Sequence, residues 1–95
     1  MKFLTYNQKK EIIKNAINEI GNFKTLDIND NNFQITFEND FELKNFENII
    51  MSKINNQSII YINSILNDDI KKYDRGMVYT ITNHPNNSNV LFIGL

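Results

Sequence analysis

Hydrophobic residues in the first quarter of the chain recur with the spacing of a helix. They fall at relative positions i, i+1, i+4, i+5 and i+8, which share one side of a helix. This stripe consists of Ile12, Ile13, Ala16, Ile17 and Ile20. Thr5 precedes Gln8 by three residues, which is the spacing of a capping box, and Gly21 stands where a left-handed residue ends many helices. The pattern predicts a helix between Thr5 and Gly21.

From Phe23 the hydrophobic period changes to two. Lys24, Leu26 and Ile28 alternate with polar neighbours, and Phe33, Ile35 and Phe37 alternate with polar residues in the same way. The connection over residues 29–32 reads Asn-Asp-Asn-Asn, and these residue types tolerate left-handed backbone and cap their own turns. This pattern predicts a β-hairpin.

A second helix is predicted over residues 43–55. Phe41 and Leu43 either extend the preceding strand or enter this helix. Its stripe is Phe46, Ile49, Ile50 and Ile54. Asn55-Asn56-Gln57 is expected to end it. Three further strands are predicted over residues 58–66, 77–83 and 90–95, the first two because they are rich in β-branched and aromatic residues. Residues 67–69 and 71–76 are expected to form a polar excursion, with or without one helical turn, and residues 84–89 a loop.

The predicted order is α-β-β-α-β-β-β, which belongs to the α+β class. We expect a mainly antiparallel sheet of about five strands with two helices packed on one face. A chain of 95 residues suffices for one compact domain, so residues 1–95 are taken as a single α+β domain.

Composition favours a folded protein of a reducing compartment. The chain is 41% hydrophobic and contains seven Phe and four Tyr but no Cys, so a core is expected without a disulfide or zinc staple. Neither a signal-peptide pattern nor an 18-residue apolar run is present, which predicts a cytoplasmic protein with no membrane contact. Asn, Ile and Lys supply 43 of the 95 residues. Their A/T-rich codons indicate a low-GC genome, such as that of a bacterium or a phage.

The residues that catalysis or cofactor binding requires are scarce. His84 is the only histidine, and the glycines at 21, 76 and 94 are too scattered for a phosphate-binding loop. The acids Asp68 and Asp69 lie near three basic residues, which is typical of a solvated, charge-balanced loop. We therefore expect no enzymatic activity, no cofactor and no metal.

One segment has the spacing of an EF-hand-like calcium loop. Asp27, Asn29, Asn31 and Glu38 stand at its ligand positions 1, 3, 5 and 12. Position 6 is Asn32, where that loop needs Gly for a sharp turn, and the flanking segments are predicted strands rather than helices. An Asn-rich hairpin is the better interpretation.

The C-terminal segments resemble the first hairpin of GIY-YIG nucleases. Met77-Val78-Tyr79 corresponds to GIY and Phe92-Ile93-Gly94 to YIG. The first glycine is displaced to Gly76, the second tyrosine is Phe92, and the catalytic arginine and metal-binding glutamate of that family would follow Leu95. The resemblance implies a nucleic-acid-binding or degenerate nuclease-derived module rather than an active nuclease. The residues expected on its phosphate side are Lys71, Lys72, Arg75 and Tyr79.

Acidic residues concentrate in the middle of the chain. Residues 25–50 contain six acids and one lysine, although the whole chain has a net charge of only −1. Five of these acids are predicted to share one end of the domain: Asp30, Glu38, Asp40, Glu42 and Glu47. Such a patch suits a basic surface on a protein partner, including the nucleic-acid groove of another protein. The alternative is an ordinary solvated face with acids placed near a helix N-terminus.

These observations favour a small non-enzymatic binding protein that inhibits a larger partner through protein–protein interaction. In size, composition and lack of catalytic residues the chain resembles phage anti-defence proteins such as anti-CRISPR inhibitors, and immunity proteins that neutralise toxins. Direct nucleic-acid binding is not expected at this net charge. A structural subunit that self-associates through an exposed sheet edge is a third interpretation.

Overall fold

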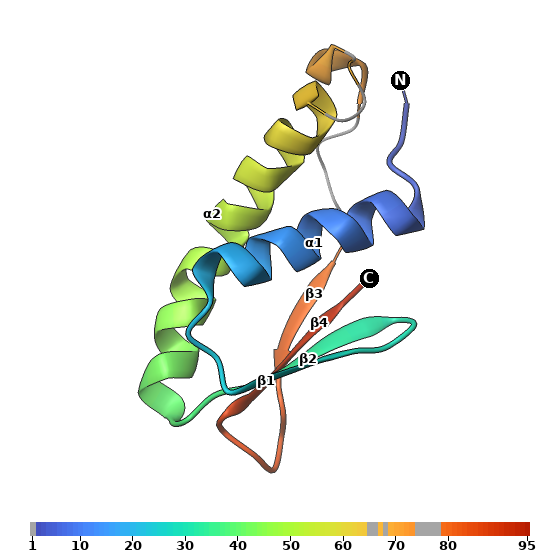
Figure 1. The fold of residues 1–95 in the computed structure, drawn as a ribbon. Coiled ribbons are helices and arrows are strands. Elements are labelled where there is room, and N and C mark those ends of the chain that lie inside the picture. The colour runs from blue at the N-terminus through green and yellow to red at the C-terminus, as the bar shows by residue number, and fades with distance from the viewer. Residues whose placement is uncertain (1, 65–66, 68, 74–78) are drawn as a thin grey trace. The chain divides into compact units, whose positions relative to one another are not determined.

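The computed structural model describes residues 2–64, 67, 69–73 and 79–95 (Figure 1). It contains two α-helices, a short 3₁₀ helix and one antiparallel sheet of four strands, which confirms the α+β class. In chain order these elements are α1 (Tyr6–Ile20), β1 (Thr25–Ile28), β2 (Asn32–Thr36), α2 (Asp40–Ser64), η1 (Ile70–Lys72), β3 (Thr80–Asn83) and β4 (Val90–Gly94).

The elements fall into two compact units. The helical unit comprises Met1–Ile20 and Ile50–Met77, and the sheet unit comprises Gly21–Ile49 and Val78–Leu95. The helical unit therefore holds α1, η1 and the second part of α2, whereas the sheet unit holds the four strands and the first part of α2. That the chain forms one domain, with both helices on one face of the sheet, stays a prediction.

Both ends of α1 follow the chemistry predicted from the sequence. The backbone N–H of Thr5 donates to Oε1 of Gln8 at 2.8 Å, and the backbone N–H of Gln8 donates to Oγ1 of Thr5 at 3.2 Å. This reciprocal pair is a capping box, which satisfies two donors that the helix itself leaves unpaired. Gly21 follows the helix with a φ of 63°, and Asn22 has a φ of 61°. Two successive left-handed residues thus turn the chain away from α1.

The predicted hairpin is confirmed. Strands β1 and β2 pair antiparallel with Thr25 opposite Thr36 and Ile28 opposite Phe33. At the turn, the backbone N–H of Asn29 donates to the carbonyl of Asn32 at 2.9 Å. The segment with calcium-loop spacing therefore contains the end of β1 and the whole of β2, which are paired as the hairpin interpretation requires.

The sheet has the order β1-β2-β4-β3, and all neighbouring strands are antiparallel. One face of its two central strands is buried, because alternate residues along each strand point the same way. These buried residues are Phe33, Ile35, Leu91 and Ile93, and Phe37, which directly follows β2, is buried as well. The first part of α2 packs against this face, since the ring centroids of Phe37 and Phe46 lie 5.1 Å apart.

The helix α2 is much longer than predicted. The expected helix over residues 43–55 is part of a helix from Asp40 to Ser64, so the strand expected over residues 58–66 is wrong as far as Ser64. Residues 65 and 66 lie outside the described residues. Buried residues recur at every fourth position along α2, which is the repeat of a helix rather than of a strand. These positions are Phe46, Ile50, Ile54, Ser58 and Ile62.

The exposed fractions of three side chains show that residues 58–62 form a helix rather than a strand. In a strand, Ser58, Ile60 and Ile62 would share one face. Instead Ser58 and Ile62 are 5% and 0% exposed, whereas Ile60 is 52% exposed. The β-branched residues of this segment favour strands only weakly, and burial of a helical stripe outweighs that preference. Asn55 and Asn56 do not end α2, because asparagine is a poor helix former but no helix breaker.

The remaining strands agree with the prediction more closely. Strands β3 and β4 pair antiparallel around the loop at residues 84–89, and the predicted residues 77 and 78 lie outside the described residues. The described residues thus form four strands rather than about five. Among these residues, no helix combines the length and hydropathy that crossing a membrane requires.

The capping box generates a first prediction. Replacing Thr5→Ala removes the oxygen that accepts from Gln8, and should lower the free energy of unfolding by about 1 kcal/mol. Urea denaturation monitored by circular dichroism measures this change. Thr5→Ser keeps the hydroxyl and should retain most of the stability. Equal losses in both variants would contradict the role of the cap.

The pairing of β3 with β4 generates a second prediction. A β-carbon at position 94 would lie 2.6 Å from Oγ1 of Thr80, the residue opposite Gly94 in the sheet. Gly94→Ala should therefore destabilise the protein by about 1 kcal/mol through overpacking. The double variant Thr80→Ala/Gly94→Ala should lose less than the sum of the two single variants. Additive losses in urea denaturation would contradict this register.

Candidate functional site

All five acids predicted to bind a partner lie in the sheet unit, but they do not form one group. Asp30 lies in the turn between β1 and β2, whereas the others follow the opposite end of β2. Since a strand rises about 3.3 Å per residue, the length of β2 separates Asp30 from them. The prediction that the five share one end is therefore wrong for Asp30. The remaining acids are Glu38, Asp40, Glu42 and Glu47.

These remaining acids lie at the start of α2. Glu38 precedes the helix, Asp40 and Glu42 belong to its first turn, and Glu47 lies one turn further along. Glu38 and Asp40 are exposed, and Glu42 and Glu47 are half-buried. Carboxylates in the first turn are favoured by the helix dipole, so Asp40 and Glu42 also stabilise the helix itself.

The first turn of α2 is held by an asparagine cap. Oδ1 of Asn39 accepts a hydrogen bond from the backbone N–H of Glu42 at 3.0 Å. The carbonyl of Asn39 accepts from the backbone N–H of Leu43 at 3.3 Å, which begins the helical pattern. Asn39 is therefore the N-cap residue, and it explains why the helix begins at Asp40, three residues before the predicted start at residue 43.

Two loops of the sheet unit hold carboxylates of this turn. Oγ of Ser88, in the loop between β3 and β4, donates to Oδ1 of Asp40 at 2.6 Å. Nδ2 of Asn22, which follows α1 in the chain, donates to Oε2 of Glu42. These two hydrogen bonds lie at the surface of the unit, and together they fix both carboxylates relative to the sheet.

The loop that carries Ser88 is hydrogen-bonded to Phe37, the residue that follows β2. The backbone N–H of Phe37 donates to the carbonyl of Asn89 at 2.9 Å, and Nδ2 of Asn89 donates to the carbonyl of Phe37 at 2.8 Å. In the same loop, Nδ1 of His84 accepts from the backbone N–H of Asn86 at 3.0 Å. The only histidine is thus part of the loop's own hydrogen bonding.

An exposed aromatic residue lies between the two fixed carboxylates in the sequence. Phe41 is 69% exposed, although its neighbours Leu43 and Phe46 are buried. The sequence alone does not identify Phe41 as a surface residue, because its pattern fits either a strand or a helix. The helical register resolves this, since Phe41 lies off the side of α2 that holds Leu43, Phe46 and Ile50.

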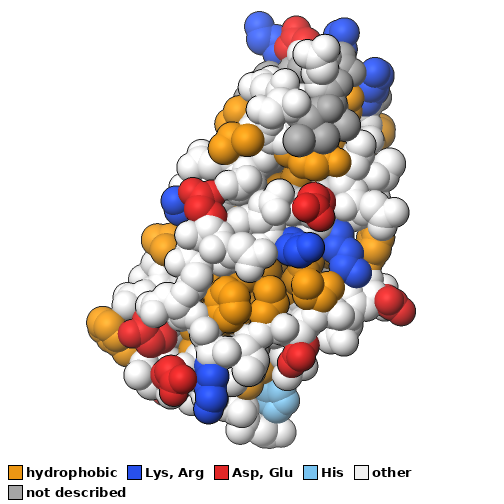
Figure 2. Space-filling view, in the orientation of Figure 1, with side chains coloured by type: hydrophobic (Ala, Val, Ile, Leu, Met, Phe, Trp, Pro, Cys, Tyr) orange, Lys and Arg blue, Asp and Glu red, His pale blue; other side chains and the backbone are white. Residues whose placement is uncertain are grey.

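The two units carry opposite net charges. The sheet unit has six acids and two lysines, for a net charge of −4, and the helical unit has a net charge of +3. Figure 2 shows acidic and basic side chains scattered among uncharged ones over the face in view. On the face in view, the charged side chains of the protein thus form no continuous acidic patch.

The residues of the alternative nucleic-acid site are divided between the units. Lys71 and Lys72 belong to η1 of the helical unit, Tyr79 precedes β3 in the sheet unit, and Arg75 lies outside the described residues. Tyr79 is half-buried, and this burial raises the pKa of its phenol. Of the segments that resemble GIY-YIG nucleases, 92–94 lies in β4, whereas 76–78 is outside the described residues.

Within the part of the chain that the structure describes, no three His, Asp or Glu side chains gather closely enough to hold a metal ion. Asp40 and Glu42, at the start of α2, accept hydrogen bonds from neutral side chains instead. That the protein needs no metal or cofactor stays a prediction.

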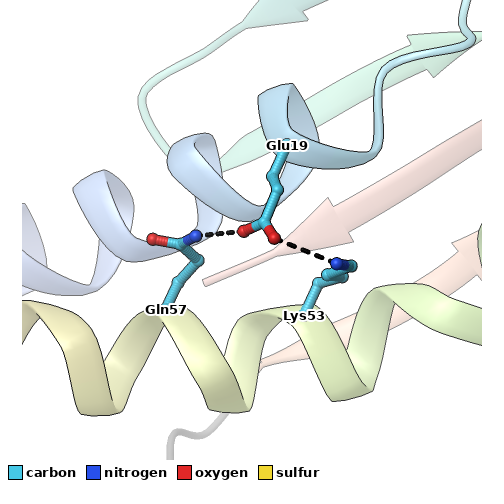
Figure 3. Close-up of polar contacts among 3 residues, drawn as sticks. All are labelled: Glu19, Lys53 and Gln57. Carbon is cyan, nitrogen blue, oxygen red and sulfur yellow. Dashed lines mark hydrogen bonds and ion pairs between the residues drawn. The ribbon is translucent and has the colours of Figure 1, made fainter.

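A separate polar cluster joins α1 to α2 within the helical unit (Figure 3). Nζ of Lys53 lies 2.9 Å from Oε1 of Glu19, and Nε2 of Gln57 donates to Oε2 of the same carboxylate. Lys53 and Gln57 are four residues apart, so they project from the same side of α2. The hydrogen bonds from Lys53 and then Gln57 lower the pKa of the Glu19 carboxyl.

Comparisons of this chain with family models, with curated proteins and with solved structures found no match. The resemblance to GIY-YIG nucleases therefore rests on the quoted residues alone. The geometry and charge of the described residues are the remaining guide to function.

The Glu19 cluster generates a prediction on pH. Because the folded-state pKa lies below the ordinary value of 4.5, the cluster stabilises the protein fully above that value. Its contribution should disappear as the pH falls through the lowered pKa. The stability difference between the wild type and Glu19→Gln should therefore shrink on acidification.

The pKa of Glu19 can be measured by NMR titration of its side-chain carboxyl carbon. Lys53→Met removes the largest cause of the shift and should move the pKa back toward 4.5. An unchanged Glu19 pKa in Lys53→Met would contradict the assigned ion pair.

Proposed function

We propose that this protein is a non-enzymatic binding protein whose acidic sheet unit docks on a basic surface of another protein. By covering such a surface, including a nucleic-acid-binding groove, it acts as an inhibitor. The observation that carries this proposal is the start of α2, where acids held by a cap and two loops lie in a unit of net charge −4.

Charge supports a basic partner in two ways. A unit of net charge −4 repels nucleic acid and steers association toward positive surfaces. The acids outside the loop contacts, Glu38 and Glu47, sit on either side of the first turn of α2 along the chain. They add charge to that surface without being part of the contacts that hold Asp40 and Glu42.

Rigidity supports specific binding over loose attraction. Asn39, Ser88 and Asn22 fix the first turn of α2 through side-chain hydrogen bonds. A surface that is ordered before binding loses less conformational entropy in the complex. The turn therefore suits a protein that acts through surface complementarity.

The helical unit supports a second candidate function, direct binding to nucleic acid. Its net charge is +3, and α1 carries Lys9, Lys10 and Lys14. Nζ of Lys10 lies 5.9 Å from the ring centroid of Tyr6, so one of these lysines is already engaged locally. The interior of α1 also carries Glu11, which reduces the positive field along the helix.

Charge-neutral variants test the proposal. A partner protein that the wild-type chain captures in stoichiometric amounts should be purified. Calorimetry then measures the affinity of this partner for the wild type, for Glu38→Gln and for Glu47→Gln. Each substitution should weaken binding about two- to fivefold and reduce its salt dependence, because each removes one screened surface charge. The double variant should combine both losses.

Glu11→Gln is the matched control, since Glu11 is also an exposed glutamate but belongs to the helical unit. It should leave the affinity unchanged. Equal affinity for wild type and the Glu38→Gln/Glu47→Gln variant would contradict the proposal. Salt-sensitive binding of a DNA or RNA oligonucleotide, lost on Lys9→Gln/Lys14→Gln, would favour the second candidate function instead.

A further inference from the structure

We propose that the loop at residues 84–89 is a pH-sensitive latch on the first turn of α2, closed while His84 is neutral and released when its imidazole is protonated. This latch lies between β3 and β4 and reaches α2 through the hydrogen bond from Ser88 to Asp40. The latch itself is a property of the free protein, whereas its effect on partner binding rests on the proposed function.

The hydrogen bond inside the latch requires a neutral imidazole. Nδ1 of His84 accepts from the backbone N–H of Asn86 at 3.0 Å. Because a backbone N–H can only donate, Nδ1 carries no proton in this arrangement. An imidazolium has two N–H donors and no acceptor, so no rotation of the charged ring restores the bond. Protonation of His84 therefore breaks this turn.

The same kind of turn is formed elsewhere by other side chains. An acceptor that bonds to the backbone N–H two residues later forms an Asx turn, for which asparagine and aspartate are the usual residues. Oδ1 of Asn87 accepts from the N–H of Asn89 at 3.3 Å, and Oδ1 of Asp69 accepts from the N–H of Lys71 at 2.9 Å. At position 84 a histidine has this role, in a chain that contains 18 asparagines. Of these three acceptor types, imidazole is the one that ordinarily gains a proton between about pH 8 and pH 5.

The imidazole is held beside β4. Its ring centroid lies 5.7 Å from that of Phe92, with 35° between the two planes, and His84 is half-buried. Pro85 restricts the backbone of His84 to extended conformations. An aromatic face attracts a cation, so the protonated ring stays beside Phe92. The charge then appears next to the N–H of Asn86, which it repels.

Hydrogen bonds connect the latch to the start of α2. Oγ of Ser88 donates to Oδ1 of Asp40 at 2.6 Å. Asn89 exchanges two hydrogen bonds with the backbone of Phe37, one of 2.9 Å through its carbonyl and one of 2.8 Å through Nδ2. Asn86 precedes Ser88 by only two residues, so loss of the turn at Asn86 loosens the residues that make these bonds. Protonation of His84 thus frees the carboxylate of Asp40.

The charged side chains near the latch ordinarily titrate in other pH ranges. Strands β2, β3 and β4 consist of uncharged residues. The charged residues of the segment that the latch contacts are Glu38, Asp40, Glu42 and Lys44. Carboxyl and ammonium groups ordinarily titrate well below and well above the histidine range. Because the bond from Asn86 exists only with a neutral ring, the closed latch is favoured at higher pH and is lost as the pH falls.

The experiment is an NMR titration of the full-length, ¹⁵N-labelled protein without a partner, from about pH 7.5 to about pH 5.5. The ring nitrogens of the single histidine report its protonation. The backbone amides of Asn86, Ser88 and Asp40 should shift with the same midpoint as the imidazole. The amide of Phe37, which donates to Asn89, should lose about fivefold in hydrogen-exchange protection at the lower pH, after correction for the intrinsic exchange rate.

His84→Asn is the matched control, because it keeps an acceptor for the N–H of Asn86 but does not titrate. Its latch should stay closed over the whole range. His84→Ala has no acceptor, so its amides at Ser88 and Asp40 should resemble those of the acidified wild type at every pH. Ser88→Ala keeps the turn but removes the bond to Asp40, so Asn86 should still follow the imidazole while Asp40 does not. Circular dichroism verifies that each variant is folded.

Three outcomes overturn the latch. One is an Asp40 amide that does not follow the imidazole in the wild type. Another is an equal pH response in His84→Asn, which assigns the response to a different group, such as the α-amino group. The third is a response of Asp40 that persists in Ser88→Ala.

Failure of the latch is distinguishable from failure of the proposed function. Each outcome that overturns the latch is observed in the free protein, and it leaves untouched the partner affinities of Glu38→Gln and Glu47→Gln. Conversely, equal partner affinity of the wild type and the Glu38→Gln/Glu47→Gln variant contradicts the proposed function, whereas the shared titration of His84 and Asp40 still supports the latch.

Discussion

The structure depends on one long helix, α2, whose buried positions are apolar except for Ser58. Positions four residues apart along α2 are buried from Phe46 to Ile62. Of the elements that the structure describes, α2 alone has residues in both units, with its first ten in the sheet unit and the rest in the helical unit. Each unit therefore gains part of its hydrophobic core from the same helix.

This dependence explains why so much polar chemistry gathers at the beginning of α2. An N-terminus leaves backbone donors unpaired, and a poorly formed first turn would fray toward the residues that fill the core. Asn39 supplies the cap, while Asp40 and Glu42 complement the dipole and bond to two loops. The same acids then remain available on the surface, so a stabilising feature and the proposed binding surface share residues.

Several local patterns are predicted correctly from the sequence, because the interaction that decides each of them is also local. Thr5 with Gln8, Gly21 after α1, and the Asn-rich turn of the hairpin all act between residues a few positions apart. The end of α2 was predicted wrongly. The β-branched residues after position 57 fit a strand pattern, and only the burial of Ser58 and Ile62 shows that they belong to a helix. For a related reason, Asp30 was placed wrongly with the other acids and Phe41 was not identified as a surface residue. Their surroundings depend on how long β2 and α2 are, and on the register of each.

The open sheet also has a consequence for how the chain behaves in a crowded solution. Its outer strands, β1 and β3, are only four residues long and carry mostly threonine, aspartate and asparagine at their exposed positions. Longer, more apolar β2 and β4 lie between them. A short polar edge strand offers a neighbouring chain few hydrogen bonds to extend, so the sheet limits amyloid-like growth at its edges.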